Sequence, residues 1–444
     1  MSNTTICAKA TAMGQAGIGV VRISGDKSLS IAKKILKFNP KPRYAYYVPF
    51  FDNKGNEIDK GIAIFYKSPN SFTGEDILEL QGHGGIVVID MVLNACINFG
   101  AKVADAGEFS KRAFLNGKID LAQAEAIADL IAANSKQAAM SALRSLSGDF
   151  SKKVANLVKK IINIRKFIEA SIDFSDEEIT FLELKQIKTK LKKIKTKLKE
   201  IIANSEQGAI LRDGIYIIIT GKPNVGKSSI LNVLTKQESA IVTAIAGTTR
   251  DILKERILID GIPINIIDSA GLRKSYDEVE KQGIKKTKVE IKKADVVLLV
   301  YDAREKPDLN LVPNDKHILL VKNKIDLLDE DIKFKTKINN KVLAEVSISA
   351  KKNKNIEKLK TEIKKIAGAN IVGEDTIMAR KRHIIHLKKA YSFISNAYLQ
   401  LKNEAIELAA EDLRQTQKQL NLITGEFSSD DLLGEIFSSF CIGK

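Results

Sequence analysis

The stretch 215–229 reads IYIIITGKPNVGKSS and decides the fold of the central part of this 444-residue chain. Its first five residues are apolar and mostly β-branched, which predicts a buried strand. Residues 221–228 match the phosphate-binding loop G-x-x-x-x-G-K-S, and a helical pattern follows, which is the context that this loop requires. We therefore predict that Lys227 reaches the terminal phosphates of a nucleotide and that Ser228 ligates Mg²⁺.

Three more motifs follow downstream apolar runs, each at the carboxyl end of a predicted strand. They are Asp268-Ser269-Ala270-Gly271, Asn323-Lys324-Ile325-Asp326 and Ser349-Ala350-Lys351. Asp268 is predicted to hold Mg²⁺ through water, and the Gly271 N–H to sense a γ-phosphate. Asp326 can accept from the ring N–H and the exocyclic amine of guanine, a donor pair that adenine lacks, so GTP is predicted over ATP. Four motifs in this order predict a doubly wound α/β GTPase domain.

The expected nucleotide contacts extend beyond the invariant letters of these motifs. They are Asn224, Val225, Gly226, Lys227, Ser228, Ser229, Thr243, Ala244, Ile245, Ala246, Gly247, Thr248, Thr249, Asp268, Ser269, Ala270, Gly271, Asn323, Lys324, Asp326, Ser349, Ala350 and Lys351. Thr249 is a candidate second ligand for Mg²⁺. Asn224 could offer its carbonyl oxygen to a cation or be a plain turn residue. Leu272 stands where many regulatory GTPases have a water-orienting Gln, so another group must place the attacking water.

Composition bounds the remaining possibilities. Lys and Arg number 71 against 54 Asp and Glu, which gives a net charge of +17. That balance fits a polyanionic partner such as nucleic acid or an acidic membrane, but a Lys- and Ile-rich composition is also what an AT-biased genome encodes. Cys7, Cys96 and Cys441 form no disulfide framework or C-x-x-C zinc site. With no membrane span or signal peptide in the sequence, a reducing cytoplasm is the expected compartment.

The GTPase motifs interrupt a helical region that begins near residue 119 and resumes near residue 378. Leu184, Ile187, Leu191, Ile194, Leu198 and Ile201 form a heptad stripe. Eight lysines between Lys185 and Lys199 occupy the other faces of this helix. They suit a solvated face, an RNA-contacting face or a membrane-surface helix. The two helical stretches are expected to pack together as one helical domain.

The part before residue 118 is predicted to be α+β, because short β-rich runs alternate with turns. The runs are 19–23, 61–66 and 77–80, with one helical run at 86–99. His83 is predicted to lie in a glycine-rich turn, and its role there is expected to be structural.

Several of these stretches resemble the MnmE (TrmE) family of tRNA-modification GTPases. They are NSFTGED at 70–76, LELQGHGG at 78–85, RAFLNGKIDLAQAEA at 112–126 and the terminal FCIGK at 440–444. The resemblance covers the whole chain and implies four segments. These are an α+β folate-binding and dimerisation domain at 1–118, helical parts at 119–209 and 373–444, and an inserted Ras-like GTPase domain at 210–372.

The resemblance also implies chemistry that spacing alone does not give. Members of the family work as homodimers with the FAD-containing partner MnmG (GidA), in a heterotetramer or larger complex. They install an aminomethyl-type group at C5 of the wobble uridine, position 34, of certain tRNAs. Positions that match the family's folate contacts are Arg22, Glu79, Lys118 and Lys444. The donor would be 5,10-methylenetetrahydrofolate or 5-formyltetrahydrofolate, with the cations meeting its carboxylates. The role of Cys441 is left open between a buried thiol and a nucleophile.

The family's GTPase is activated by K⁺. Positions that match its ion site are Asn224, Thr243, Ile245 and Thr248. A monovalent cation there would take the place of an arginine finger. Glu280 matches the acid that orients water and is the expected catalytic residue. This chain departs from the family in Ser269, where Thr is usual, and in a proline-free loop at 11–17.

Two other classes of function share part of this evidence. An RNA-binding ribosome-assembly GTPase would carry the same four motifs but would have no use for a folate pocket. A membrane-remodelling GTPase would use the lysine-rich helix against anionic lipid.

Overall fold

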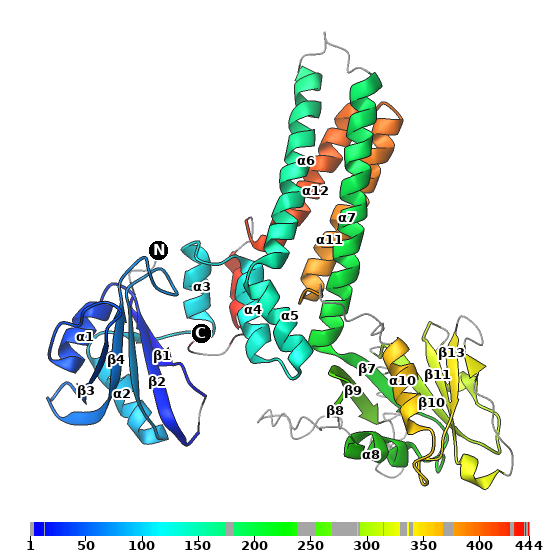
Figure 1. Cartoon of the computed structure of the whole chain (residues 1–444), viewed down its shortest axis with the longest axis horizontal. Coiled ribbons are helices and arrows are strands. Elements are labelled where there is room, and N and C mark those ends of the chain that lie inside the picture. Colours follow the sequence, from blue (N-terminus) through cyan, green and yellow to red (C-terminus); the bar gives the residue numbers. More distant parts are fainter. Residues whose placement is uncertain are drawn as a thin grey trace, which may run out of the picture. The chain divides into compact units, whose positions relative to one another are not determined.

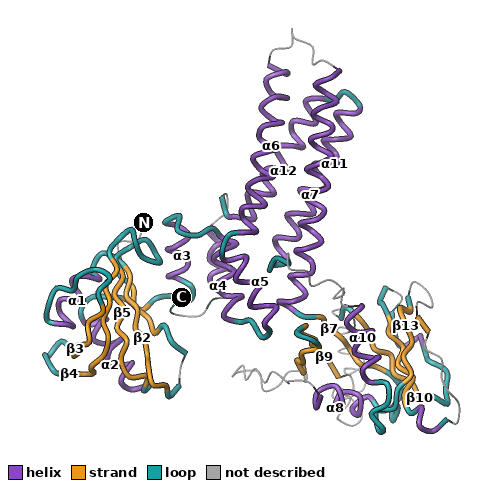
Figure 2. Tube along the Cα trace, in the orientation of Figure 1, coloured by secondary structure: helices purple, strands orange, loops and turns teal. Residues whose placement is uncertain are grey.

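The structure, a computed structural model, describes residues 4–12, 14–173, 181–237, 254–268, 291, 294–313, 315–328, 335–336, 341–366, 376–426, 430–438, 440 and 443. The chain forms two compact units. Unit 1 comprises 1–128, 146–179 and 399–444, and unit 2 comprises 129–145 and 180–398. Figures 1 and 2 show the elements of both units. None of the helices in the described ranges combines the length with the apolar character that a membrane span requires.

Unit 1 contains a six-stranded sheet in the order β3-β4-β5-β2-β1-β6. Its strands are β1 (Ile6–Lys9), β2 (Ala16–Ser24), β3 (Ala45–Phe51), β4 (Glu57–Tyr66), β5 (Ile77–Gly84) and β6 (Lys102–Val103). Helices α1 (Ser28–Leu36) and α2 (Ile86–Asn98) share one apolar core with this sheet. The predicted α+β arrangement of this part is therefore what the chain forms.

Side-chain alternation separates the two faces of this sheet. Val21 and Ile23 of β2 belong to the core with α1 and α2, as do Leu78 and Leu80 of β5. Because successive side chains of a strand point to opposite faces, the residues between them face the other way. That second face carries a smaller apolar cluster of Ile6, Ala8, Phe72, Ala104 and Phe109.

Two details of unit 1 differ from the sequence prediction. One helix was predicted in this part, but the structure contains two more, α1 and α3 (Glu108–Leu115). Each has fewer than ten residues, so its periodic pattern is too short to identify locally. The predicted glycine-rich turn around His83 was wrong, because Gly82, His83 and Gly84 continue strand β5. A Cβ on Gly82 would lie 2.1 Å from Asp59 Oδ2, so a side chain there would displace the carboxylate that accepts from the His83 N–H.

The helices of unit 1 come from both sides of the inserted segment. They include α6 (Asp149–Asp173), α12 (Ile406–Thr424), α13 (Asp430–Ser438) and most of α4 (Leu121–Ile131), whose last three residues belong to unit 2. Helix α6 packs against α12, and Arg165 Nη1 donates to Gln417 Oε1 at 2.5 Å. The expectation that the separated helical stretches pack together is confirmed for this pair.

Unit 2 contains a seven-stranded sheet in the order β12-β13-β11-β10-β7-β9-β8. Its strands are β7 (Ile215–Thr220), β8 (Lys254–Ile259), β9 (Ile262–Asp268), β10 (Val296–Asp302), β11 (Ile318–Asn323), β12 (Lys335–Thr336) and β13 (Val342–Ser347). The five central strands are parallel and the edge strands β8 and β12 are antiparallel. Each face of the sheet is covered by its own apolar cluster, as in a doubly wound fold.

Helices of unit 2 cover this sheet and extend from it. Helices α8 (Lys227–Gln237) and α10 (Ile356–Ile366) contribute to one of the two clusters. The unit also contains α5 (Lys136–Leu146), α7 (Phe181–Asp213) and α11 (Lys381–Lys402). The predicted heptad stripe lies on α7, and its members from Ile187 to Ile201 are at most 4% exposed.

Candidate functional site: the strand-end edge of the inserted sheet

The GTPase motifs meet at one edge of the unit 2 sheet. Strands β7, β10, β11 and β13 are parallel neighbours, so their carboxyl ends lie together. The chain leaves β7 for β8 and β9 on one side and reaches β10 on the other, so the strand order reverses at β7. Ligands of open α/β sheets bind outside the strand ends at such a switch point. The phosphate-loop sequence follows β7 directly.

Backbone geometry in this loop requires residues that tolerate positive φ. Gly221, Asn224 and Gly226 have φ of +148°, +61° and +93°. A Cβ on Gly221 would lie 2.1 Å from the Val300 carbonyl oxygen, and a Cβ on Gly226 would lie 2.3 Å from Asn323 Nδ2. The loop is therefore pressed against the ends of β10 and β11, and a side chain at either glycine would move it.

Lys227 is positioned by its own loop. It begins α8, is 8% exposed, and its Nζ donates to the carbonyl oxygens of Gly221 at 3.0 Å and Lys222 at 2.8 Å. The ammonium group is thus held at the mouth of the loop beside the helix N-terminus. A helix N-terminus and a lysine together attract an anion, so the loop fits a phosphate group. Ser228 follows in the first turn of α8 and is exposed.

Asn323 connects the phosphate loop to the loop after β13. Its side chain is 2% exposed. The amide Nδ2 donates to the Val225 carbonyl oxygen at 2.8 Å, and Oδ1 accepts from the Ala350 N–H at 3.1 Å. One buried amide therefore fixes the distance between two nucleotide loops that are 125 residues apart in the chain.

Asp326 lies beside Ser349, as the order of the motifs predicts. Ser349 Oγ donates to Asp326 Oδ1 at 2.5 Å, and this hydrogen bond lowers the pKa of the Asp326 carboxyl. Lys351 and Lys352 act in the same direction through their charge. Asp326 is exposed and ionised at neutral pH, so its other oxygen can accept from a base that enters this edge.

Asp302, at the end of β10, belongs to this edge and sequence reasoning missed it. Its side chain is 8% exposed and pairs with Arg304 at 2.8 Å and with Lys324 Nζ at 3.0 Å. Hydrogen bonds from Arg304, and further from Lys324, hold the pKa of this carboxyl well below its usual range. Lys324, whose side chain forms this ion pair, has φ +67°, a backbone conformation that few residues adopt. The sequence feature that could have revealed Asp302 is a carboxylate at the end of a buried strand, although it belongs to none of the four motifs.

Other predicted residues of this edge are placed only in part. The backbone of Asp268 pairs with Ile219 across β9 and β7, next to the phosphate loop. Thr243, Ala244, Ile245, Ala246, Gly247, Thr248, Thr249, Ser269, Ala270, Gly271 and Glu280 lie outside the described residues. Their predicted roles stay predictions.

The predicted folate contacts lie in unit 1. Arg22 and Glu79 are direct cross-strand neighbours on β2 and β5, and Arg22 Nε donates to Glu79 Oε1 at 2.8 Å. Both occupy the second face of the sheet, where the Arg22 guanidinium lies 5.9 Å from the ring centres of Phe72 and Phe109. Their side chains are 21% and 15% exposed, so an incoming group can reach them.

The other two predicted folate contacts are placed less completely. Lys118 Nζ donates to the Pro69 carbonyl oxygen at 2.9 Å, and its stem lies against Gly74 in the 67–76 loop. That loop includes Phe72, which also borders Arg22. Cys441 and Lys444 lie outside the described residues, while Gly443 between them packs on the Lys9 carbonyl oxygen.

Comparison with known proteins covers the whole chain. The model of the MnmE helical domain matches residues 121–441, and that of the GTP-binding protein TrmE N-terminus matches residues 5–118. The tRNA modification GTPase MnmE of Ruthia magnifica subsp. Calyptogena magnifica is 57% identical, over 100% of this chain and 99% of that protein. The MnmE of Coxiella burnetii, strain Dugway 5J108-111, is 52% identical, over 99% and 98%.

Among solved structures, the G domain of the T. maritima FeoB iron transporter is 25% identical to this chain. The match covers 34% of this chain and 98% of that domain, with a TM-score of 0.25.

Proposed function

The chain belongs to the MnmE family of tRNA modification GTPases, and on that premise we propose that its GTP hydrolysis drives a folate-dependent modification of the wobble uridine of certain tRNAs. The observation that carries this proposal is the full-length match, which includes the N-terminal unit as well as the GTPase motifs. A ribosome-assembly GTPase or a membrane-remodelling GTPase would not require that N-terminal sequence.

For the nucleotide, the sequence motifs and the described part of the strand-end edge together support a division of labour. Lys227 and the N–H groups of the loop would bind the phosphates, and Ser228 with Thr249 would hold Mg²⁺, which neutralises charge on the β- and γ-phosphates. Asp326 and Ser349 would select guanine. Asn323 would hold the phosphate loop and the base loop at a fixed separation, because it bonds to both.

For catalysis, we propose that Glu280 orients the attacking water, since Leu272 has no polar atom. Asn224 would contribute to a K⁺ site with Thr243, Ile245 and Thr248. Asn224 has the left-handed backbone conformation, which asparagine tolerates in tight loops. The bound K⁺ would supply the positive charge that an arginine finger supplies in other GTPases.

This cation assignment has a direct test. Hydrolysis of GTP by the full chain should be at least about tenfold faster in KCl than in NaCl at equal ionic strength. Glu280→Ala should lower kcat and leave the Kd for GDP unchanged. Equal rates in the two salts would refute the K⁺ site, and a parallel loss of GDP affinity would give Glu280 a structural role.

In the N-terminal unit, we propose that Arg22, Glu79 and Lys118, with Lys444, bind 5,10-methylenetetrahydrofolate or 5-formyltetrahydrofolate. The Arg22–Glu79 pair fits this ligand because it offers a guanidinium donor and a carboxylate acceptor. The guanidinium also lies near two aromatic rings, those of Phe72 and Phe109. Glu79 would accept from the N–H edge of the pterin. The folate supplies the one-carbon group, and these residues bind and orient it.

Calorimetry with 5-formyltetrahydrofolate tests this site. Arg22→Ala should abolish measurable binding, whereas Lys33→Ala, which removes an exposed cation of helix α1 in the same unit, should not. Unchanged binding in Arg22→Ala would contradict the assignment. We further propose that the chain acts as a homodimer with an MnmG-type flavoprotein that carries FAD, in the cytoplasm where its tRNA substrates are.

A further inference from the structure

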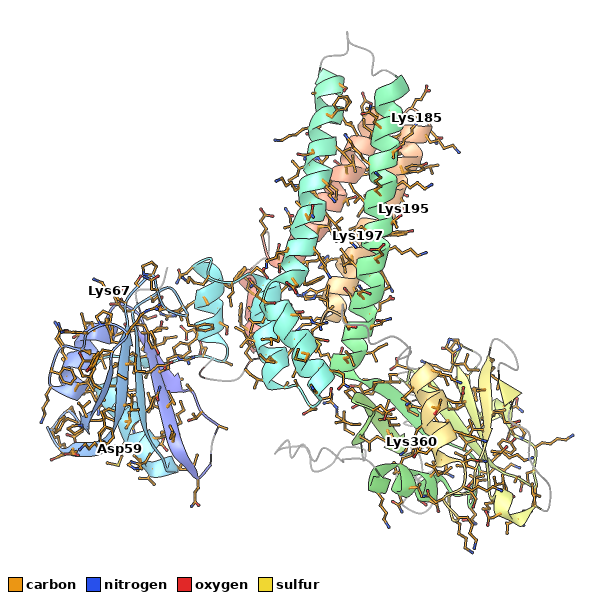
Figure 3. The ribbon with its side chains drawn as sticks, viewed as in Figure 1. Asp59, Lys67, Lys185, Lys195, Lys197 and Lys360 are labelled. Carbon is orange, nitrogen blue, oxygen red and sulfur yellow. The ribbon has the colours of Figure 1, made fainter. Side chains whose placement is uncertain are left out.

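Helix α7 carries a pattern of lysines that the GTPase and folate sites do not use. Between residues 185 and 199 there are eight lysines and no Asp or Glu. The apolar stripe of the same helix is buried, so the lysines occupy its remaining faces. Lys188 and Lys195 are partly exposed and the other six are exposed. Lys185, Lys195 and Lys197 can be followed along α7 in Figure 3.

These lysines form two rows along the helix. Spacings of three and four residues place Lys185, Lys188, Lys192, Lys195 and Lys199 in the first row. Lys190, Lys193 and Lys197 form the second row by the same rule. The first row extends about 21 Å, with a lysine about every 5 Å along the axis. Such a spacing is close to that of successive phosphates along a nucleic-acid strand.

The rows lack the acidic partners that lysines have on other helices of this chain. On α10, Lys360 pairs with Glu357 at 2.9 Å and Lys365 with Glu362 at 2.6 Å. Within the described part of α7, Lys197 pairs with Glu200 at 2.7 Å, and the other seven lysines of the rows form no ion pair. Lys195 lies 5.2 Å from the ring centre of Tyr391 on α11. A lysine-rich genome would explain the number of lysines but not the missing acids.

Like charges three or four residues apart destabilise a helix. The first row contains four such consecutive pairs, and the attraction of a polyanion to these lysines would offset their mutual repulsion. We propose that the two lysine rows of α7 bind the phosphate backbone of the tRNA substrate. This inference rests on the proposed function for the identity of the polyanion. RNA is favoured over a membrane because the apolar stripe of α7 is buried and leaves no apolar face to insert into lipid.

Contacts of this kind carry no sequence information and depend strongly on salt. The test measures binding of an unmodified tRNA transcript to the full chain over a series of KCl concentrations. The variant Lys185→Gln/Lys192→Gln/Lys199→Gln should bind at least about tenfold more weakly at 0.1 M salt. Its slope of log affinity against log salt should be shallower by about 2 to 3.

Matched variants separate charge from folding. Lys→Arg at the same three positions should retain the wild-type affinity. Lys33→Gln/Lys54→Gln/Lys102→Gln, which removes three exposed lysines of unit 1, should also bind like the wild type. GTP hydrolysis without tRNA should be equal in all four proteins, which shows that the weakened variant is folded.

Three results would overturn the proposal. One is an unchanged affinity and slope in the Lys→Gln row variant, and another is a wild-type chain that does not bind the transcript. The third is a Lys→Gln row variant that retains the wild-type affinity for tRNA but no longer binds the anionic phosphatidylserine vesicles that the wild-type chain binds. The K⁺ dependence of hydrolysis and the binding of folate are measured without tRNA, so these two parts of the proposed function are tested separately.

Discussion

At the scale of single residues, the nucleotide edge depends on short polar contacts between loops that are distant in sequence. Asn323 spans two loops with one amide, and Ser349 donates to Asp326. Asp302 fixes Lys324 through an ion pair. Because bonds within the chain hold each of these side chains, little conformational entropy is lost when a base enters the site.

Asp326→Asn should change the base that this edge selects. The carboxylate accepts from two donors of guanine, and an amide would present an N–H to one of them. We expect affinity for GDP to fall at least about a hundredfold, and xanthosine diphosphate to bind better than GDP. Competition with a fluorescent nucleotide measures both. The exposed Asp315→Asn is the control and should bind GDP normally; an Asp326→Asn protein with wild-type preference would exclude this role.

At the scale of elements, the phosphate loop is shaped by the strand ends that surround it. Gly221 approaches the backbone at the end of β10, and Gly226 approaches Asn323 at the end of β11. The loop therefore has its phosphate-binding shape because three parallel strands terminate together.

Gly226→Ala should disable the loop without unfolding the unit. A methyl group 2.3 Å from Asn323 Nδ2 must displace that amide, and a φ of +93° is unfavourable for alanine by about 1–2 kcal/mol. We expect nucleotide binding to become undetectable by fluorescence, with a circular dichroism spectrum like that of the wild type. Gly434→Ala, where a Cβ meets nothing within 4 Å, should have no effect. Normal nucleotide affinity in Gly226→Ala would show that the loop can rearrange freely.

The same elements show what could be predicted from the sequence. The strand, loop and helix around Lys227 could be predicted because their sequence pattern is local, and so could the ends of β9 and β11. The Asn323 bridge and the Arg22–Glu79 pair could not, since they arise from sheet order and register between strands far apart in the chain. His83 was misplaced because neighbouring glycines suggest a turn, whereas here they permit the close approach of Asp59 to a strand.

At the scale of the whole molecule, the chain must connect an inserted sheet to the helices that flank it. Arg212 lies near the end of α7, just before the first strand of the inserted sheet. Arg380 lies just before α11, after the last helix that packs on that sheet. Both bond to Asp129 Oδ1, at 2.8 Å and 2.9 Å, and the Asp129 side chain is 7% exposed. A single carboxylate therefore joins the two points where the chain enters and leaves the insertion.

Asp129→Asn should destabilise unit 2. Removing this charge leaves two arginines, of which Arg380 is 13% exposed, without their shared anion. We expect a loss of about 2–3 kcal/mol in the free energy of unfolding, measured with urea. Glu411→Gln, which removes an ion pair whose two partners are each 53% exposed, should cost less than about 0.5 kcal/mol. Equal effects in the two variants would mean that the junction is not a structural clamp.

Guanine recognition at the strand ends is the step that we propose to drive modification of tRNA. Its most direct test is mass spectrometry of wobble uridines from a bacterial strain that lacks its own MnmE and carries either this chain or its Asp326→Asn variant. The account predicts that the wild-type chain restores the C5 substituent and that the variant leaves unmodified uridine. Full restoration by the Asp326→Asn variant, or none by the wild-type chain, would contradict it.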